Sequence, residues 1–154
     1  MTFFEKGKLN FDFVCFGGGN FSKTEEELFR SLSLDRSRIH YFEGDQLDLN
    51  YFYQKARIFI FPSLYEGFGI PLLEAMNMEC PVMCSDTSCF PEIVNDAAIL
   101  FDPTDIGSLE FKMEKLIYDD QLLLNLKKKG NDNLNNYNWK KCAYETEKLY
   151  KKII

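Results

Sequence analysis

The sequence predicts an α/β fold: a Rossmann-like parallel sheet with helices on both faces, followed by a helical C-terminus. Short apolar runs alternate with helical patterns of about ten residues, which is typical of successive βαβ units. Residues 57–61 are apolar on both faces, as in a central strand of a parallel sheet. Only helical patterns follow residue 101. These three observations exclude an all-α or all-β fold.

Each predicted strand is a short apolar run bounded by a turn signal. The run at 11–16 ends at the glycines 17–19, and the later strands are separated by polar or helical segments. The expected strands are residues 11–16, 39–42, 57–61, 81–84 and 98–101.

The predicted helices rest on apolar periodicity and on end signals. Ser22 or Thr24 is the expected cap of the first helix, and acidic residues 25–27 suit its first turn. Pro71 is expected at the first position of the third helix, and Gly130 is expected to end the sixth, with a loop at 131–138. The expected helices are residues 24–32, 47–56, 71–78, 91–94, 108–118, 121–129 and 139–153.

Length and composition fit one globular domain, residues 1–154, that is 45% hydrophobic and 27% charged. No apolar run is long enough to span a membrane, and the N-terminus lacks the pattern of a signal peptide, so we expect a cytoplasmic protein. The five cysteines include no CxxC pair and His40 is the only histidine. We therefore expect neither a disulfide framework nor a metal site.

Charge is distributed unevenly along the chain. The net charge of −6 argues against nucleic acid as a partner. Residues 1–126 carry a balance of −11, whereas residues 127–154 carry +5. The favoured interpretation of the basic end is the solvated face of a terminal helix, and contact with a membrane surface or an acidic partner domain is the alternative.

The stretch "SLYEGFGIPLLEAM", residues 63–76, follows the third strand at the sheet edge where ligands of parallel sheets bind. Gly67 and Gly69 let backbone amides approach a ligand, and the helix beginning at Pro71 suits a phosphate. Glu74 is placed to accept hydrogen bonds from a vicinal diol such as a ribose, and Glu66 to meet a second polyol. A nucleotide sugar has this order of groups; a tight turn with a capping glutamate explains the residues equally well.

A resemblance that extends over a longer part of the sequence favours the nucleotide-sugar interpretation. The segments "FPSLYEGFGIPLLEAM" and "CPVMCSDTSCFPEIVNDAAILFDPTD" resemble the group 1 glycosyltransferases, family four of the sugar-transferase classification, and in particular their mannosyltransferase-like branch. The glutamate pair matches the E-x7-E signature of these retaining enzymes, and "FVCFGGGNFS" resembles their glycine-bearing strand end. The resemblance implies the C-terminal, donor-binding half of a GT-B fold and covers residues 11–154.

The resemblance also implies roles for particular residues. Glu66 is the expected catalytic residue, in contact with the donor sugar, and Glu74 holds the ribose. The donor is a GDP- or UDP-linked sugar, with no cofactor and no metal. The remaining expected donor-binding residues are Gly67, Phe68, Gly69, Ile70, Leu72, Phe42, Glu43, Gly17 and Gly18.

Two departures from the family pattern stand out. Glu79 occupies the position of a usual glycine before "PV". The family's N-terminal acceptor domain and the first strand of its donor domain have no counterpart, and residues 58–111 contain no Lys or Arg to neutralise a diphosphate.

We therefore expect a C-terminal fragment or one half of a split enzyme, inactive alone, with the missing domain supplied in cis or in trans. The parent enzyme would move a sugar to a glycan or lipid-linked acceptor in polysaccharide or lipopolysaccharide synthesis, in the cytoplasm or peripheral to the inner membrane face. A non-catalytic nucleotide-sugar-binding module and a degenerate fragment are the alternatives. Half a cleft exposes apolar surface, which favours self-association.

Overall fold

The structure is a computed structural model that describes residues 11–153. The first ten residues and Ile154 of the expected domain lie outside the described residues. The chain divides into two units, Met1–Tyr51 and Phe52–Ile154. The boundary falls inside helix α2 (Gln46–Lys55). Each unit is described by itself.

The first unit holds two parallel strands, β1 (Phe13–Phe16) and β2 (Ile39–Phe42), joined through α1 (Lys23–Ser31) and the 3-10 turn η2 (Arg36–Arg38). Ser22 caps α1 as expected: its Oγ accepts the amide of Glu25, whose carboxylate accepts the amide of Ser22 in return.

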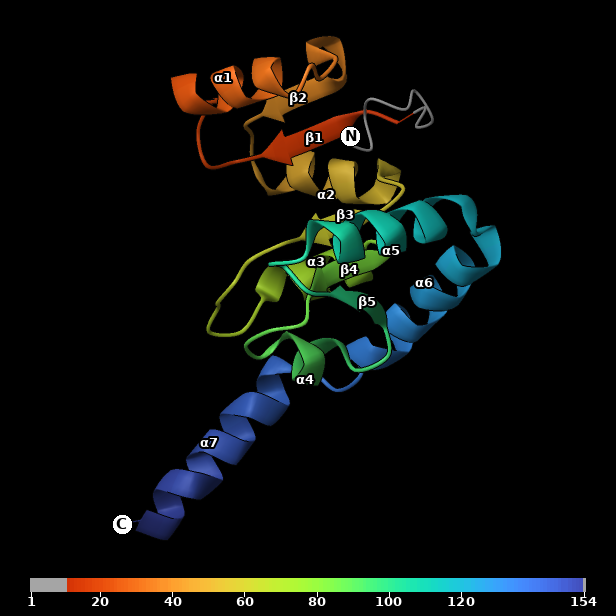
Figure 1. Ribbon diagram of the computed structural model, residues 1–154. Helices are drawn as coiled ribbons and strands as arrows, with labels where there is room; N and C mark the ends of the chain where they lie inside the picture. Colours follow the sequence, from red (N-terminus) through yellow and green to blue (C-terminus); the bar gives the residue numbers. More distant parts are fainter. Residues whose placement is uncertain (1–10, 154) are drawn as a thin grey trace. The chain divides into compact units, whose positions relative to one another are not determined.

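The second unit contains a three-stranded parallel sheet in the order β3–β4–β5 (Figure 1). The strands and helices confirm the expected alternation and end in a helical segment. They are β3 (Phe59–Phe61), α3 (Ile70–Asn77), β4 (Val82–Ser85), α4 (Phe90–Val94), β5 (Ala98–Phe101), α5 (Ile106–Tyr118), α6 (Asp120–Leu134) and α7 (Trp139–Ile153).

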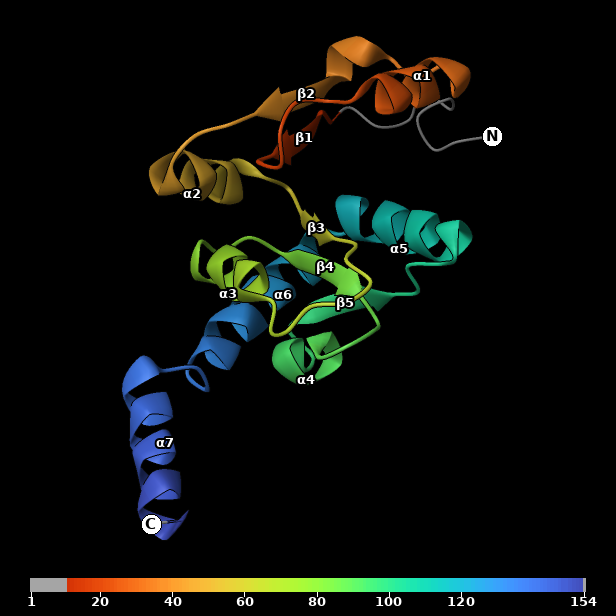
Figure 2. The ribbon, with the colours of Figure 1, turned by 90° about the vertical axis from the view of Figure 1, so that its left-hand side faces the viewer.

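Helices cover both faces of this sheet, with α3 on one side and α5 on the other (Figure 2). The core joins β4 and β5 to α5 and α6. Its fully enclosed members include Met83, Phe101 and Leu116. By contrast, α7 has no buried residue, and both ribbon views show it leading away from the sheet.

Two expectations from the sequence are wrong in detail. Gly130 does not end the sixth helix, because α6 continues to Leu134 and takes in part of the expected loop. A Cβ at Gly130 would lie 3.1 Å from Cγ of Met76 on α3, so this glycine permits close packing of two helices. The expected central strand β3 is an edge strand of the sheet within the described residues. Its apolar faces are nevertheless used, because Phe59 packs on Tyr53 and Phe61 on Phe90.

Candidate functional site

The loop between β3 and α3, residues 62–69, lies at the carboxyl end of the sheet, as the sequence predicts. Glu66 is exposed in this loop, and its Oε1 accepts a hydrogen bond from Oγ of Ser63 at 3.0 Å. The carboxylate is thus held by one local hydroxyl and otherwise faces solvent. It can accept further hydrogen bonds from a polar ligand.

Gly69 forms the junction between the loop and α3. Its φ of +98° lies in the left-handed region, and a Cβ there would come within 3.1 Å of Leu72 and 3.2 Å of Phe90. Both facts require glycine at this position. Gly67, in contrast, has no neighbour within 4 Å of an added Cβ, so its backbone is open to approach from outside.

The four consecutive backbone amides of residues 67–70, those of Gly67, Phe68, Gly69 and Ile70, have no hydrogen-bond acceptor among residues 11–153. Pro71 has no N–H, and the amide of Leu72 donates to the carbonyl of Gly69 at 3.0 Å. The side chain of Leu72 is fully buried, so its part is to anchor α3. The free donors at this helix start are therefore the four amides of residues 67–70, directly before Pro71.

Glu74 lies one turn into α3 and is half-buried, and within the described residues its carboxylate has no hydrogen bond or ion pair. Tyr53 of α2 is buried nearby. Burial raises the pKa of the Tyr53 phenol, and the Glu74 carboxylate adds to the rise. The structure thus places a carboxylate without a partner among the described residues one helical turn beyond the four free amides of residues 67–70.

Residues 87–89, between β4 and α4, bind the same loop. Their side chains bond to alternate carbonyls of residues 64–68, an arrangement that the sequence does not reveal because it joins positions more than 20 residues apart. The bonds are Thr87 Oγ1 to Leu64 O at 3.1 Å, Ser88 Oγ to Glu66 O at 2.9 Å, and Cys89 Sγ to Phe68 O at 3.3 Å and Glu66 O at 3.4 Å.

The side chains of Phe68 and Ile70 belong to the same four residues as the free amides. The ring of Phe68 packs edge-on against Tyr137, with centroids 5.8 Å apart, and the Tyr137 hydroxyl donates to the carbonyl of Ile93 at 2.9 Å. The side chain of Ile70 is half exposed. Both apolar side chains remain accessible beside the amides.

The other expected donor residues lie in the first unit. The amide of Gly17 donates to the carbonyl of Phe42 at 3.0 Å, so the glycine turn and the end of β2 lie side by side. Gly17 and Gly18 both have positive φ. Glu43 accepts a hydrogen bond from Tyr41 at 3.1 Å. These four residues form one group, and the residues from Glu66 to Glu74 form another in the second unit.

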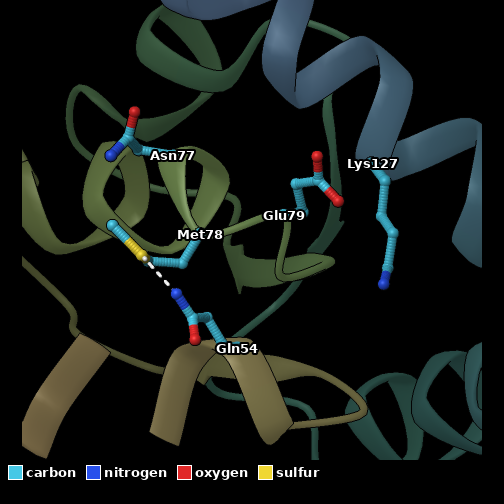
Figure 3. A pocket seen from close by; sticks show the side chains of 5 residues that line it. All are labelled: Gln54, Asn77, Met78, Glu79 and Lys127. Carbon is cyan, nitrogen blue, oxygen red and sulfur yellow. Dashed lines mark hydrogen bonds between the residues drawn. The ribbon is translucent and has the colours of Figure 1, made fainter. Parts of the chain in front are cut away.

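A separate hollow of about 350 Å³ lies at the C-terminal end of α3, where it is lined by residues that include Asn77 and Met78 (Figure 3). Glu79 lines it and adopts φ +55°. Its amide bonds to the carbonyl of Met76 and that of Cys80 to the carbonyl of Ala75, which is the Schellman pattern that glycine usually completes. Glycine would adopt this left-handed conformation without the strain that a side chain adds. The hollow does not include any expected donor residue.

Residues 11–153 contain no cluster of three or more His, Cys, Asp or Glu side chains that could hold a metal ion. Nor does any helix there have the length and apolar character needed to cross a membrane.

Comparison with solved structures shows the fold. The C-terminal domain of a group 1 glycosyl transferase, LpcC from Francisella tularensis, is 29% identical, with a TM-score of 0.63 over 74% of this chain and 60% of that one. Sucrose-phosphate synthase from Thermosynechococcus elongatus gives a TM-score of 0.78 at 24% identity, covering 91% of this chain and 38% of that one. Both similarities support an α/β GT-B half.

Comparison with curated proteins shows the family. O-antigen chain mannosyltransferase B from Escherichia coli is 38% identical over 104 residues, and mannosyltransferase RfbU from Salmonella typhimurium is 32% identical over 107. The matches cover 68% and 70% of this chain but only 27% and 30% of those proteins. Residues 4–133 match the family model described as glycosyl transferases group 1. This chain belongs to the group 1 glycosyl transferases.

Proposed function

We propose that the chain is the donor-binding part of a retaining glycosyltransferase that transfers a sugar from a nucleotide-diphosphate sugar to a glycan or lipid-linked acceptor. One observation carries the proposal: four amides without an acceptor among residues 11–153, those of residues 67–70, lie along the chain between Glu66 and Glu74. Amides at a helix start suit a diphosphate, and the carboxylates on either side suit hydroxyl groups.

In this arrangement Glu66 meets the donor sugar and Glu74 the ribose. The transition state of transfer develops positive charge on the sugar and negative charge on the leaving diphosphate. Amides held in advance toward the diphosphate stabilise that negative charge without reorganisation during the reaction. Glu66, exposed and held only by Ser63, is available to the sugar.

The sugar we propose is mannose, because the curated relatives at 38% and 32% identity are named mannosyltransferases of O-antigen chains. The proposed donor is accordingly GDP-mannose, with a UDP-linked sugar as the other nucleotide class to test. The acceptor is a growing polysaccharide chain or its lipid-linked precursor.

The diphosphate also needs cations, and residues 58–111 contain no Lys or Arg. We propose that a partner domain supplies them, in cis or in trans. The chain covers less than a third of the two mannosyltransferases, so those proteins have ample length for such a domain. The isolated chain should therefore bind a donor weakly and transfer no sugar.

Calorimetric titration with GDP, UDP, ADP and their sugar conjugates tests the site. We expect weak binding that selects one base and is lost in Glu74→Gln, which removes the charge but keeps the shape. Glu114→Gln, on the exposed side of α5, is the matched control. Binding that does not depend on Glu74, or that fails for every nucleotide, would contradict the proposed donor site.

A second candidate function is a nucleotide-sugar-binding module without turnover, favoured by the absence of Lys and Arg from residues 58–111, which include the proposed diphosphate site. Turnover separates the two. Sugar transfer after addition of the partner domain, lost in Glu66→Gln, would establish the enzyme. Equal donor binding with no transfer under the same conditions would establish the module.

A further inference from the structure

The three side chains of residues 87–89 form what we call the carbonyl clamp. They bond to the carbonyls of Leu64, Glu66 and Phe68, every second carbonyl of the glutamate loop, over distances of 2.9 to 3.3 Å. Nothing in the sequence of either segment demands such alternation. A regular set of bonds between two loops fixes the direction of each peptide plane that it touches.

The direction matters because the peptide bonds of the described residues are all trans. In a trans peptide the C=O of one residue and the N–H of the next point in opposite directions. When the carbonyl of Glu66 is held toward Ser88, the amide of Gly67 must point away from the clamp. The carbonyl of Phe68, held by Cys89, turns the amide of Gly69 the same way.

We infer that the carbonyl clamp is a positioning device, which aims the amides of Gly67 and Gly69 at the diphosphate of the donor. This assignment rests on the proposed function. Thr87, Ser88 and Cys89 do not touch the ligand in this scheme. They act through the loop, by preventing the peptide planes from flipping.

Two local features show that these side chains are directed toward the loop. Ser88 adopts φ +54°, in the left-handed region that non-glycine residues rarely occupy, and this conformation carries the hydroxyl that reaches Glu66. Cys89 lies at the N-cap position of α4 but makes no side-chain bond to that helix. Its thiol instead lies 3.3 to 3.4 Å from two loop carbonyls.

The thiol has one proton, which it shares between the carbonyls of Glu66 and Phe68. A hydroxyl is a stronger donor than a thiol, so Cys89→Ser should preserve the clamp. Cys89→Ala removes the donor with little change in volume. Comparing Cys89→Ser with Cys89→Ala therefore distinguishes the effect of losing the hydrogen bond from the effect of disturbing the packing.

The first test measures the loop without ligand. We would compare the full chain with the triple variant Thr87→Val, Ser88→Ala, Cys89→Ala by backbone ¹⁵N relaxation. Order parameters at the amides of Gly67 and Gly69 should fall from values typical of a rigid backbone, about 0.85, toward those of a flexible loop, below about 0.6. Unchanged order parameters would overturn the clamp.

The second test measures the ligand by calorimetry with GDP and UDP. We expect the triple variant to bind the nucleotide at least tenfold more weakly, and Cys89→Ser alone to bind as the wild type does. Thr146→Val is the matched control, because its hydroxyl also donates to a backbone carbonyl, that of Cys142 at 2.8 Å, but on α7. Equal affinity of the triple variant and the wild type would overturn the positioning role.

The two tests fail separately. If the wild type binds no nucleotide, the proposed donor site is refuted, and so is the diphosphate as the ligand toward which the clamp directs the amides. The relaxation measurement still decides whether the clamp orders the loop. If the wild type binds and the triple variant binds equally well, the proposed function stands and the clamp's role in it is refuted. Urea unfolding of each variant verifies that the chain is folded.

Discussion

Glu79→Gly should stabilise the protein, although it removes a whole side chain. Glu79 is the residue after the C-cap of α3, where the Schellman bonds from Glu79 to Met76 and from Cys80 to Ala75 impose φ +55°. A side chain in the left-handed region costs about 1–2 kcal/mol relative to glycine. The carboxylate of Glu79 has no hydrogen bond or ion pair within the described residues, so nothing is lost in exchange.

The gain is smaller than the strain because glycine is freer in the unfolded chain, which costs about 0.5–1 kcal/mol. The net expectation is about 0.5–1 kcal/mol of added stability, or about 1–4 °C in Tm for a chain of this size. Urea and thermal unfolding would measure it.

A short series tests the reasoning behind this value. Glu79→Ala removes the carboxylate but keeps the strained backbone, so its free energy of unfolding should stay within about 0.5 kcal/mol of the wild type. Glu79→Asn should fall between alanine and glycine, because asparagine tolerates the left-handed region. If glycine is no more stable than alanine here, the backbone is not strained and the argument is refuted.

Three further predictions concern the second unit. Gly69→Ala should destabilise by about 2–4 kcal/mol, from the left-handed φ and the 3.1 Å contact, whereas Gly67→Ala should cost under about 1 kcal/mol; urea unfolding compares them. Ser85→Ala should raise stability by about 1 kcal/mol in the same assay, because the buried Ser85 hydroxyl has no hydrogen-bond partner among residues 11–153. Burial raises the pKa of the Cys80 and Cys84 thiols to about 12, so between pH 9 and 12 the unfolded state loses protons that the folded state keeps. Stability should fall over that range, by at most about 1.4 kcal/mol per pH unit for each thiol, and urea midpoints at pH 8 and 10.5 should differ less in the double alanine variant.

Much of the fold could be predicted because local signals and tertiary structure agree. Residues 59–61 of the expected strand 57–61 do form a strand, Ser22 does cap a helix, and Pro71 does lie in the first turn of another. Gly130 shows the limit of such reasoning. A glycine in the sequence is compatible both with the end of a helix and with a close contact between two helices. Only the position of Met76 on another helix shows that Gly130 serves the close contact.

The candidate site also has one part that could be predicted from the sequence and one part that could not. The glycines and glutamates of residues 66–74 were predictable, because a turn without side chains before a helix start is a local pattern with a chemical meaning. The carbonyl clamp was not, since Thr87 and Leu64 are 23 residues apart and meet only through the pairing of β3 with β4. The engagement of the Leu72 amide by Gly69 likewise depends on the path of the turn.

Glu79 and Ser88 adopt nearly the same left-handed backbone conformation, with φ +55° and +54°. They differ in whether the side chain makes a hydrogen bond that depends on this conformation. At Glu79 the helix end imposes the conformation and the side chain makes no use of it. At Ser88 the conformation aims a hydroxyl that bonds the carbonyl of Glu66, so replacement by glycine would relieve strain and remove the bond together. The hydrogen bond of Ser88 thus offsets the strain of its own backbone. The same bond positions the loop that carries the proposed catalytic glutamate, which gives the strained conformation a role at the site.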